Sequence, residues 1–329
     1  MISVVIPYFQ REPGVLRRAL QSVASQDYRG NIEVIVVDDG SPAAVEPEIA
    51  SVTFAPTISV RTIRQANRGP AAARNSALAA LSHSTKYVAL LDSDDTWFAE
   101  HIRRAVCALE AGHDVYFSDI LGMNKPQSWM AQQRRDDVSL HSPLPGLPSA
   151  FRFEGNMVDQ IITASLMITS TVVFDARFAP DLRFAEDLFS AGEDQLYFLM
   201  LAVRGARFCF SSNCEAAIGR GVNIHQGVKR GTEASRIRLA NEIRYRKKVL
   251  SWEALSTRQR KLISKQLGQS RVGFLLDVLH SLRLGRRVDL AVMWRQARED
   301  PKTFLAAGRT AIRVLSSLAT RRIKGSGEL

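Results

Sequence analysis

The sequence contains little of what disulfide-stabilised or zinc-binding proteins depend on. Its 329 residues include only three cysteines, Cys107, Cys209 and Cys214, and no two of them have the spacing of a metal-binding pair. Because an odd number argues against a disulfide framework, we expect reduced thiols and a cytoplasmic protein. No basic leader precedes the strand-like start of the chain, so we also expect no signal peptide.

Long apolar runs are missing as well. The longest candidate, residues 161–174, contains serine and threonine and is shorter than the ~20 residues that cross a bilayer as a helix. We therefore expect a soluble protein or one attached to the inner face of the cell membrane. Zinc-finger spacings and the glycine–aromatic motif of RNA-binding sheets are absent too, so we expect no nucleic acid partner.

Charge is distributed unevenly along the chain. The net charge is +11, yet residues 229–329 contain 24 Lys and Arg against 8 Asp and Glu, whereas residues 1–228 contain 20 against 25. This contrast predicts two regions with separate surfaces, an acidic domain over 1–228 and a basic extension over 229–329.

Short apolar runs alternate with helical patterns in the first third of the chain. Strands are predicted at residues 3–6, 32–37, 58–63, 87–91 and 115–117, and helices at residues 15–24, 70–81 and 98–109. This order predicts an α/β fold, with a mostly parallel sheet covered by helices on both faces. Ligands of such sheets bind beyond the carboxyl ends of the strands.

The rest of the chain has a weaker pattern. Residues 122–150 lack periodicity and predict either a loop over the site or a plain surface loop. The remaining predictions are a helix at 156–163, a strand at 166–174, a helix at 193–203, a strand at 208–210, and helices from residue 232 onward.

Acidic side chains end two of the predicted strands. Asp38 and Asp39 occur in VVDDGSP, and Asp92, Asp94 and Asp95 occur in LLDSDDTW. Carboxylates of this kind suit Mg²⁺ or Mn²⁺. Alternatively, Asp-Gly and Asp-Ser form turns and Asp caps helices, but two clusters at one sheet edge favour a cation site.

Four segments together resemble a known family. Residues 3–11, 36–42, 67–78 and 90–97 are similar, in order and spacing, to the nucleotide-binding half of family 2 glycosyltransferases. The resemblance implies the GT-A fold, a nucleotide-diphosphate sugar donor (by family habit a UDP-sugar), Mn²⁺ or Mg²⁺, and inversion at the anomeric carbon. It divides the domain into a nucleotide-sugar-binding half over 1–120 and an acceptor-binding half over 121–228.

The resemblance assigns roles to residues around the nucleotide. Asp38 matches the carboxylate that recognises the base. Pro7 and Tyr8 would line the base and ribose site, with Asp39 nearby. Arg74 falls where the family helix places a cation near the nucleotide; alternatively it is a solvated helix arginine.

The DxD pair is matched by Asp92 and Asp94. The resemblance implies that Asp92, with Ser93, holds the nucleotide-sugar and also belongs to the metal site, and that Asp94 binds the metal directly. Asp95 assists or caps the following helix. His225, in GVNIHQG, resembles the histidine that some GT-A enzymes place on the metal or the diphosphate. The alternative is a structural histidine.

The acceptor half supplies a base in this interpretation. The segment SAGEDQLYFL at 190–199 resembles the family's Glu-Asp motif at a helix start. An in-line displacement needs a carboxylate that takes the acceptor proton, and we assign this role to Asp194, with Glu193 as second choice or as the residue that orients the acceptor. Alternatively both stabilise the start of the helix.

The basic extension allows three interpretations. Residues 232–329 form a helical subdomain with solvated charges, contact an anionic membrane, or mediate self-association into a homo-oligomer. The acceptor would be a glycan or a lipid-linked glycan. A nucleotidyltransferase would need a glycine-rich loop near residues 3–11, which is absent, and a non-catalytic GT-A-like binding subunit of a polysaccharide assembly complex would predict a broken DxD or Glu-Asp pair, whereas both are intact.

Overall fold

The computed structural model describes residues 1–122, 127–134, 137–189, 191–221 and 228–305. The chain forms two compact units. The first comprises Met1–Phe189 and Glu193–Asn223, and the second comprises Ser190–Gly192 and Ile224–Leu329.

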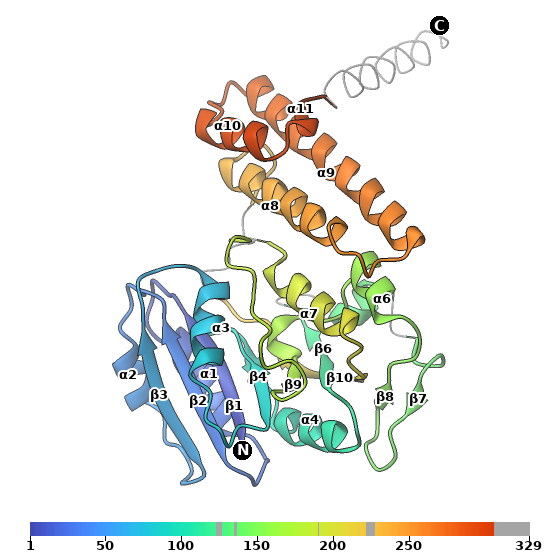
Figure 1. Ribbon diagram of the computed structural model, residues 1–329. Coiled ribbons are helices and arrows are strands. Elements are labelled where there is room, and N and C mark those ends of the chain that lie inside the picture. Colours follow the sequence, from blue (N-terminus) through green and yellow to red (C-terminus); the bar gives the residue numbers. More distant parts are fainter. Residues whose placement is uncertain (123–126, 135–136, 190, 222–227, 306–329) are drawn as a thin grey trace, which may run out of the picture. The chain divides into compact units, whose positions relative to one another are not determined.

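A ten-stranded mixed sheet forms the centre of the first unit (Figure 1). The strand order is β3-β2-β1-β4-β9-β6-β10-β8-β7, and β5 pairs with β10. The strands are β1 Ile2–Tyr8, β2 Ile32–Asp38, β3 Ile58–Arg64, β4 Tyr87–Leu90, β5 Thr96–Trp97, β6 Val115–Leu121, β7 Ser142–Pro143, β8 Ala150–Arg152, β9 Val173–Asp175 and β10 Phe208–Ala217. The strands β3, β2, β1 and β4 are parallel to one another.

Helices flank this sheet. They are α1 Val15–Ala24, α2 Val45–Ala50, α3 Pro70–Ala79, α4 His101–Glu110, α5 Trp129–Gln132, α6 Met157–Thr163 and α7 Glu193–Val203, with a 3₁₀ turn η1 at Thr169–Thr171. The helix α3 begins at Pro70 directly after Gly69, whose φ of 87° suits glycine. The Asn156 side chain caps α6 by accepting a hydrogen bond from the Asp159 amide.

Both faces of the parallel strands are buried. Ile2, Val4 and Ile6 pack in one apolar core with Leu20 of α1 and Ile102 of α4. Alternate residues of the same strands point to the opposite face, and α3 packs against β1 and β2. The expected α/β architecture, a mixed sheet flanked by helices with a helical C-terminal region, is confirmed.

The expected strand over 166–174 is wrong in its first part. Residues Thr169–Thr171 form η1, and only Val173–Asp175 pairs as β9. The Thr171 hydroxyl donates a 2.8 Å hydrogen bond to the Ile168 carbonyl. Because such side chains compete for backbone groups, they favour a turn over a ladder. The expected loop over 122–150 also contains α5, β7 and the start of β8.

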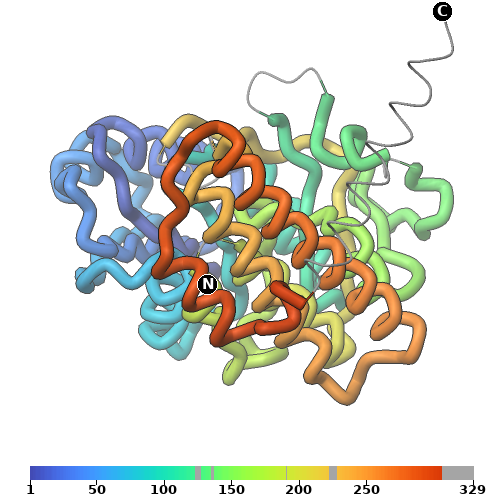
Figure 2. The backbone as a smooth tube through the Cα atoms, turned by 90° about the horizontal axis from the view of Figure 1, so that it is seen from above, coloured from blue at the N-terminus to red at the C-terminus, as the bar shows by residue number. Residues whose placement is uncertain are grey.

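The second unit consists of helices. They are α8 Glu233–Leu250, α9 Thr257–Arg283, α10 Leu290–Glu299 and α11 Lys302–Leu305. The helix α9 runs back alongside α8 (Figure 1 and Figure 2). A small core of Ile243, Leu267, Phe274 and Val278 holds them together. No helix within the described ranges is both long enough and apolar enough to cross a membrane.

Candidate active site

The two acidic clusters lie at the same edge of the sheet. Asp38 is the last residue of β2, and Asp92 follows β4 by two residues. Because both strands are parallel to β1, their carboxyl ends meet at one edge. β1 lies between them, so the clusters are separated by the end of one strand, at Tyr8.

Asp38 and Asp39 have different surroundings. The Asp38 carboxylate accepts a 2.8 Å hydrogen bond from the Ser41 amide and lies 3.9 Å from the Arg64 guanidinium. Asp39 is almost fully buried and accepts hydrogen bonds from the Arg68 and Gly69 amides at 2.9 and 2.7 Å. Asp39 therefore holds the segment that leads into α3.

The other residues expected around the nucleotide differ in exposure. Tyr8 is completely buried in the core, and burial raises the pKa of its phenol. Ser93 is also buried and accepts a hydrogen bond from the Gln10 amide group at 3.1 Å. Pro7 and Asp92 remain partly exposed. The structure thus leaves Pro7, Asp38 and Asp92 accessible to a ligand at this edge.

Arg74 joins the DxD segment to the Glu-Asp motif. Its guanidinium is buried and donates to Asp92 at 2.7 Å and to Glu193 at 3.4 Å. The guanidinium carbon also lies 5.3 Å from the centre of the Phe184 ring. A buried cation in contact with two carboxylates lowers the cost of burying their charge. Arg74 is therefore a bridge between residues far apart in the chain, rather than a solvated helix arginine.

Three carboxylates crowd together after β4. Burial, followed by the charge of Asp92, raises the pKa of Asp94 to about 6. Burial, followed by the charges of Asp92 and Asp94, raises the pKa of Asp95 to about 7. Such crowding disfavours the ionised forms, and a bound cation would reverse this.

The donor set fits a hard divalent cation that also binds phosphate. Within the described ranges, no group of three or more His, Cys, Asp and Glu side chains is placed to hold a metal ion. However, Mg²⁺ is usually held by one or two carboxylates plus substrate phosphates and water. Asp92 and Asp94 meet that requirement. His225 lies outside the described residues.

The Glu-Asp motif begins α7. Burial, and next the adjacent Asp194 carboxylate, raise the pKa of Glu193 to about 7. The Asp194 carboxylate accepts hydrogen bonds from the Gln195 amide at 2.6 Å and from the Thr169 hydroxyl at 3.4 Å. Asp194 therefore contacts η1, and Glu193 contacts Arg74.

The turn η1 links both acidic motifs. The Ser170 hydroxyl accepts a 3.1 Å hydrogen bond from the Asp92 amide and donates a 2.6 Å hydrogen bond to the Asp95 carboxylate. The backbone carbonyl of Ser170 accepts a 2.5 Å hydrogen bond from the Trp97 indole. Because Ser170 is fully buried, these bonds fix the shape of the segment that carries Asp92 and Asp94.

Two glycines that follow β10 pack closely against the segment that carries Asp94 and Asp95. The Gly219 amide donates a 3.0 Å hydrogen bond to Asp95. A Cβ atom at Gly219 would overlap the Asp94 carbonyl oxygen, and one at Gly221 would come 2.5 Å from the Asp94 Cβ. Only glycine allows this close approach.

Sequence reasoning missed Ser170 and Gly219. The signals that could have found them are the Thr-Ser-Thr run inside an apolar stretch and the two closely spaced glycines in IGRG at 218–221.

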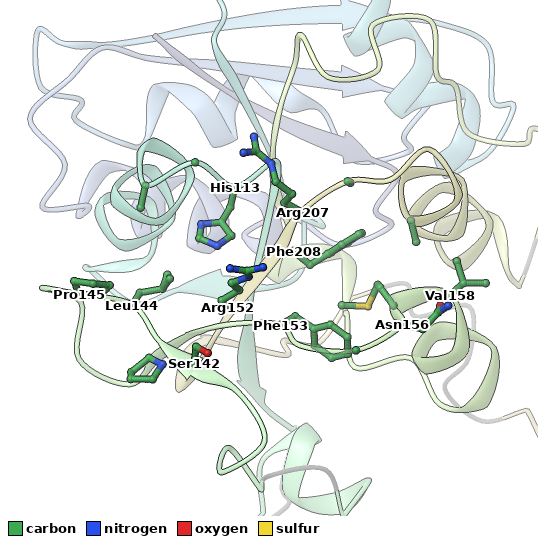
Figure 3. A pocket seen from close by; sticks show the side chains of 17 residues that line it. His113, Ser142, Leu144, Pro145, Arg152, Phe153, Asn156, Val158, Arg207 and Phe208 are labelled. Atoms are coloured by element: carbon green, nitrogen blue, oxygen red, sulfur yellow. The ribbon is translucent and has the colours of Figure 1, made fainter.

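A separate cavity lies at the opposite edge of the sheet (Figure 3). It has a volume of about 760 Å³ and includes His113, Arg152 and Arg207 in its lining. His113 precedes β6 and Arg207 precedes β10, so the cavity is at the amino ends of these strands. None of the residues expected in the active site lines it.

Comparisons with known proteins identify the family. The profile described as Glycosyl transferase family 2 matches residues 3–172. The chain therefore belongs to glycosyl transferase family 2 and is a glycosyltransferase.

Two curated relatives illustrate the range of similarity. The chain is 29% identical over 228 residues to the succinoglycan biosynthesis protein ExoW of Rhizobium meliloti, which covers 69% of this chain and 71% of that protein. It is 34% identical over 99 residues to the minor teichoic acid biosynthesis protein GgaA of Bacillus subtilis, which covers 30% of this chain and only 22% of that protein.

Solved structures confirm the GT-A fold. The structure of S. aureus TarS 1-349 in complex with UDP-GlcNAc aligns with a TM-score of 0.59 at 18% identity and covers 84% of this chain and 81% of that chain. The mannosyltransferase PcManGT from Pyrobaculum calidifontis, in complex with GDP-Man and Mn²⁺, aligns with a TM-score of 0.56 at 15% identity. The alignment covers 96% of this chain and 86% of that chain.

Proposed function

We propose that the protein transfers a sugar, with inversion, from a UDP-sugar to an acceptor hydroxyl on a glycan or a lipid-linked glycan. The observation that carries this proposal is the ion-pair chain from Asp92 through Arg74 to Glu193. It connects the carboxylates expected at the donor diphosphate with the motif expected to supply the base.

Each carboxylate has a distinct role in this proposal. Asp38 recognises the base of the nucleotide, next to Pro7 and the end of β1. Asp92 and Asp94 would hold a Mn²⁺ or Mg²⁺ ion, and the chemistry that this ion would supply is stabilisation of negative charge on the nucleotide diphosphate as it leaves. Asp194 takes the proton of the acceptor hydroxyl as it attacks the anomeric carbon. Its contact with Thr169 orients the carboxylate.

Glu193 has a supporting role. Its contact with Arg74 and its raised pKa distinguish it from Asp194. It orients the acceptor and keeps the Arg74 guanidinium aligned with Asp92. A neutral Glu193 at low pH would leave Asp92 as the only anionic partner of Arg74 in this chain of contacts.

The ligands of related proteins support the class of donor, a nucleotide-diphosphate sugar, and leave the nucleotide to be tested. TarS was solved with UDP-GlcNAc and PcManGT with GDP-Man and Mn²⁺. Both ligands are nucleotide-diphosphate sugars, which supports this class of donor. A thermal-shift panel of UDP-, GDP- and dTDP-sugars with Mn²⁺ identifies the nucleotide, and we expect the largest rise in melting temperature with a UDP-sugar.

The test of the function is metal-dependent donor turnover. We expect the protein to release nucleoside diphosphate from its donor in Mn²⁺ or Mg²⁺, and we expect Asp94→Ala to abolish release. Asp194→Asn should still bind the donor in the thermal-shift assay but lose transfer to the acceptor by at least about 10²-fold, the scale of a lost general base.

The control is Asp181→Asn, which changes an exposed carboxylate paired with Arg204. This variant should retain the wild-type rate. Metal-independent turnover, or wild-type turnover in Asp94→Ala, would overturn the proposal.

A further inference from the structure

The turn between α9 and α10 exposes large apolar side chains. Within residues 279–298 these are Leu279, Leu282, Leu284, Leu290 and Trp294. Leu290 is 79% exposed and Trp294 65% exposed, and the two are four residues apart on α10, so they share one face of that helix. Several large apolar side chains exposed within one short stretch of the chain are typical of an interaction surface.

These side chains are not the edge of the core. On α9, Phe274 and Val278 fill the core of the second unit. On α10, Val292 and Met293 pack against the same core. The inner face of each helix is therefore already apolar, and Leu290 and Trp294 form an additional apolar face on α10.

Exposed arginines are interleaved with this apolar face. The same residues 279–298 contain five arginines and a single acidic residue, Asp289. The arginines are Arg283, Arg286, Arg287, Arg295 and Arg298, and all five are exposed. The Arg298 guanidinium carbon lies 5.2 Å from the centre of the Trp294 ring, which keeps a cation beside the largest apolar side chain.

We propose that this basic apolar corner, residues 279–298, binds the surface of an anionic lipid bilayer. Leucine and tryptophan side chains enter the boundary between headgroups and acyl chains, while arginines pair with lipid phosphates. The membrane contact expected for residues 232–329 is thereby assigned to residues 279–298. This proposal does not depend on the transfer reaction.

Charge argues against a second copy of the chain as the occupant. A two-fold symmetric interface places the same patch on both sides. It would bring five arginines against five others with only one aspartate from each copy. An anionic bilayer instead offers the opposite charge together with an apolar interior.

The experiment uses the full chain and two kinds of vesicle. We expect the protein to co-sediment with phosphatidylcholine vesicles containing about one third phosphatidylglycerol, and not with pure phosphatidylcholine, because arginines are attracted to an anionic lipid surface and not to a neutral one. Leu290→Ser combined with Trp294→Ser should lower the vesicle partition coefficient at least about tenfold. Arg283→Gln combined with Arg287→Gln should do the same.

Matched controls separate this corner from general charge and apolarity. Lys261→Gln with Lys265→Gln removes two exposed charges from the other end of α9, and Leu140→Ser removes an exposed leucine from the first unit. Both should bind vesicles within about twofold of wild type, because neither alters the corner.

Three results would overturn the proposal. One is that the wild-type protein does not bind anionic vesicles. Another is that the corner variants and their controls lose vesicle binding to the same extent. The third is a lipid-free wild-type dimer, seen by light scattering, that dissociates in the Leu290/Trp294 variant, since the corner would then bind a second copy.

Discussion

The Ser170 hydroxyl donates a 2.6 Å hydrogen bond to the Asp95 carboxylate and at the same time accepts a hydrogen bond from the Asp92 amide. One buried hydroxyl thereby fixes both ends of the segment that carries the DxD pair.

Ser170→Ala should remove both contacts without adding volume. The partly buried Asp92 amide and the buried Asp95 carboxylate each lose a partner, and we expect a loss of about 1–3 kcal/mol in the free energy of unfolding. If Ser170 also positions the metal carboxylates, the Mn²⁺ concentration for half-maximal activity should rise about tenfold, which corresponds to about 1.4 kcal/mol. Denaturant unfolding and Mn²⁺ titration of activity measure the two effects.

The control is Ser51→Ala, which removes a hydroxyl bonded to a backbone carbonyl outside the site. It should leave the Mn²⁺ titration unchanged. A wild-type Mn²⁺ requirement in Ser170→Ala would limit Ser170 to a structural role.

Arg74→Lys should be far from conservative. Lysine keeps the charge but lacks the planar fork that reaches Asp92 and Glu193 together. We expect the loss of one ion pair and a drop of at least about tenfold in kcat. Arg74→Ala should lose further stability, because Glu193 and the partly exposed Asp92 both lose their cation, at a cost of at most about 3–5 kcal/mol. Steady-state kinetics and urea unfolding measure these changes.

Arg64→Ala provides the comparison for Arg74. Arg64 is exposed and pairs with Glu46, and pairs of that kind contribute less than about 1 kcal/mol. Similar losses of stability in Arg64→Ala and Arg74→Ala would contradict the bridging role.

Gly219→Ala should disturb the DxD segment directly. The added Cβ meets the Asp94 carbonyl oxygen, so backbone must move and we expect loss of metal-dependent activity. Gly268→Ala is the matched change, because nothing lies within 4 Å of its Cβ position in α9. That variant should gain up to about 1 kcal/mol of helix stability and keep full activity. Melting temperatures and activity assays distinguish the two, and an active Gly219→Ala enzyme would refute the close approach.

Glu193 should make the protein less stable at alkaline pH. Its pKa is raised from the usual 4.5 to about 7 by burial and by Asp194. Between these values the folded protein holds a proton that the unfolded chain has lost, so this contribution favours folding increasingly as pH falls from about 7 toward 4.5. Glu193→Gln should therefore melt above wild type at pH 8, and the difference should vanish near pH 5.

Glu186→Gln should change the melting temperature in the opposite direction. Hydrogen bonds from Asn75 and then Arg68 lower the pKa of Glu186, so its charge favours folding at pH 8 and its removal should lower the melting temperature slightly. A lower melting temperature for both variants at pH 8 would contradict the assignment for Glu193.

Local patterns were enough to predict several elements. The helices over 15–24 and 193–203 were predicted with the bounds observed for α1 and α7, because apolar spacing within ten or so residues defines them. The shared edge of the acidic clusters followed from strand direction alone. The roles expected for Asp38, Asp92, Asp94 and Asp194 stay predictions until activity is measured.

Contacts between distant segments could not be predicted in this way. Ser170 is 75 positions from Asp95, and Arg74 is 119 positions from Glu193. Periodicity describes which face of an element is buried, but it says nothing about which side chain meets another across the fold. The strand expected over 166–174 failed partly for this reason, because Thr169 and Ser170 bond to distant acidic residues, and partly because Thr171 bonds to a nearby backbone carbonyl.

The position of Arg74 has a consequence for engineering. A single guanidinium contacts one acid from before residue 120 and one from after it, so the charge balance at Arg74 involves both stretches. Grafting an acceptor region from a relative onto this nucleotide region would leave an excess or a deficit of charge unless positions 74, 92 and 193 are transplanted as a set. Chimeric transferases built on this scaffold should therefore be cut so that all three come from one parent.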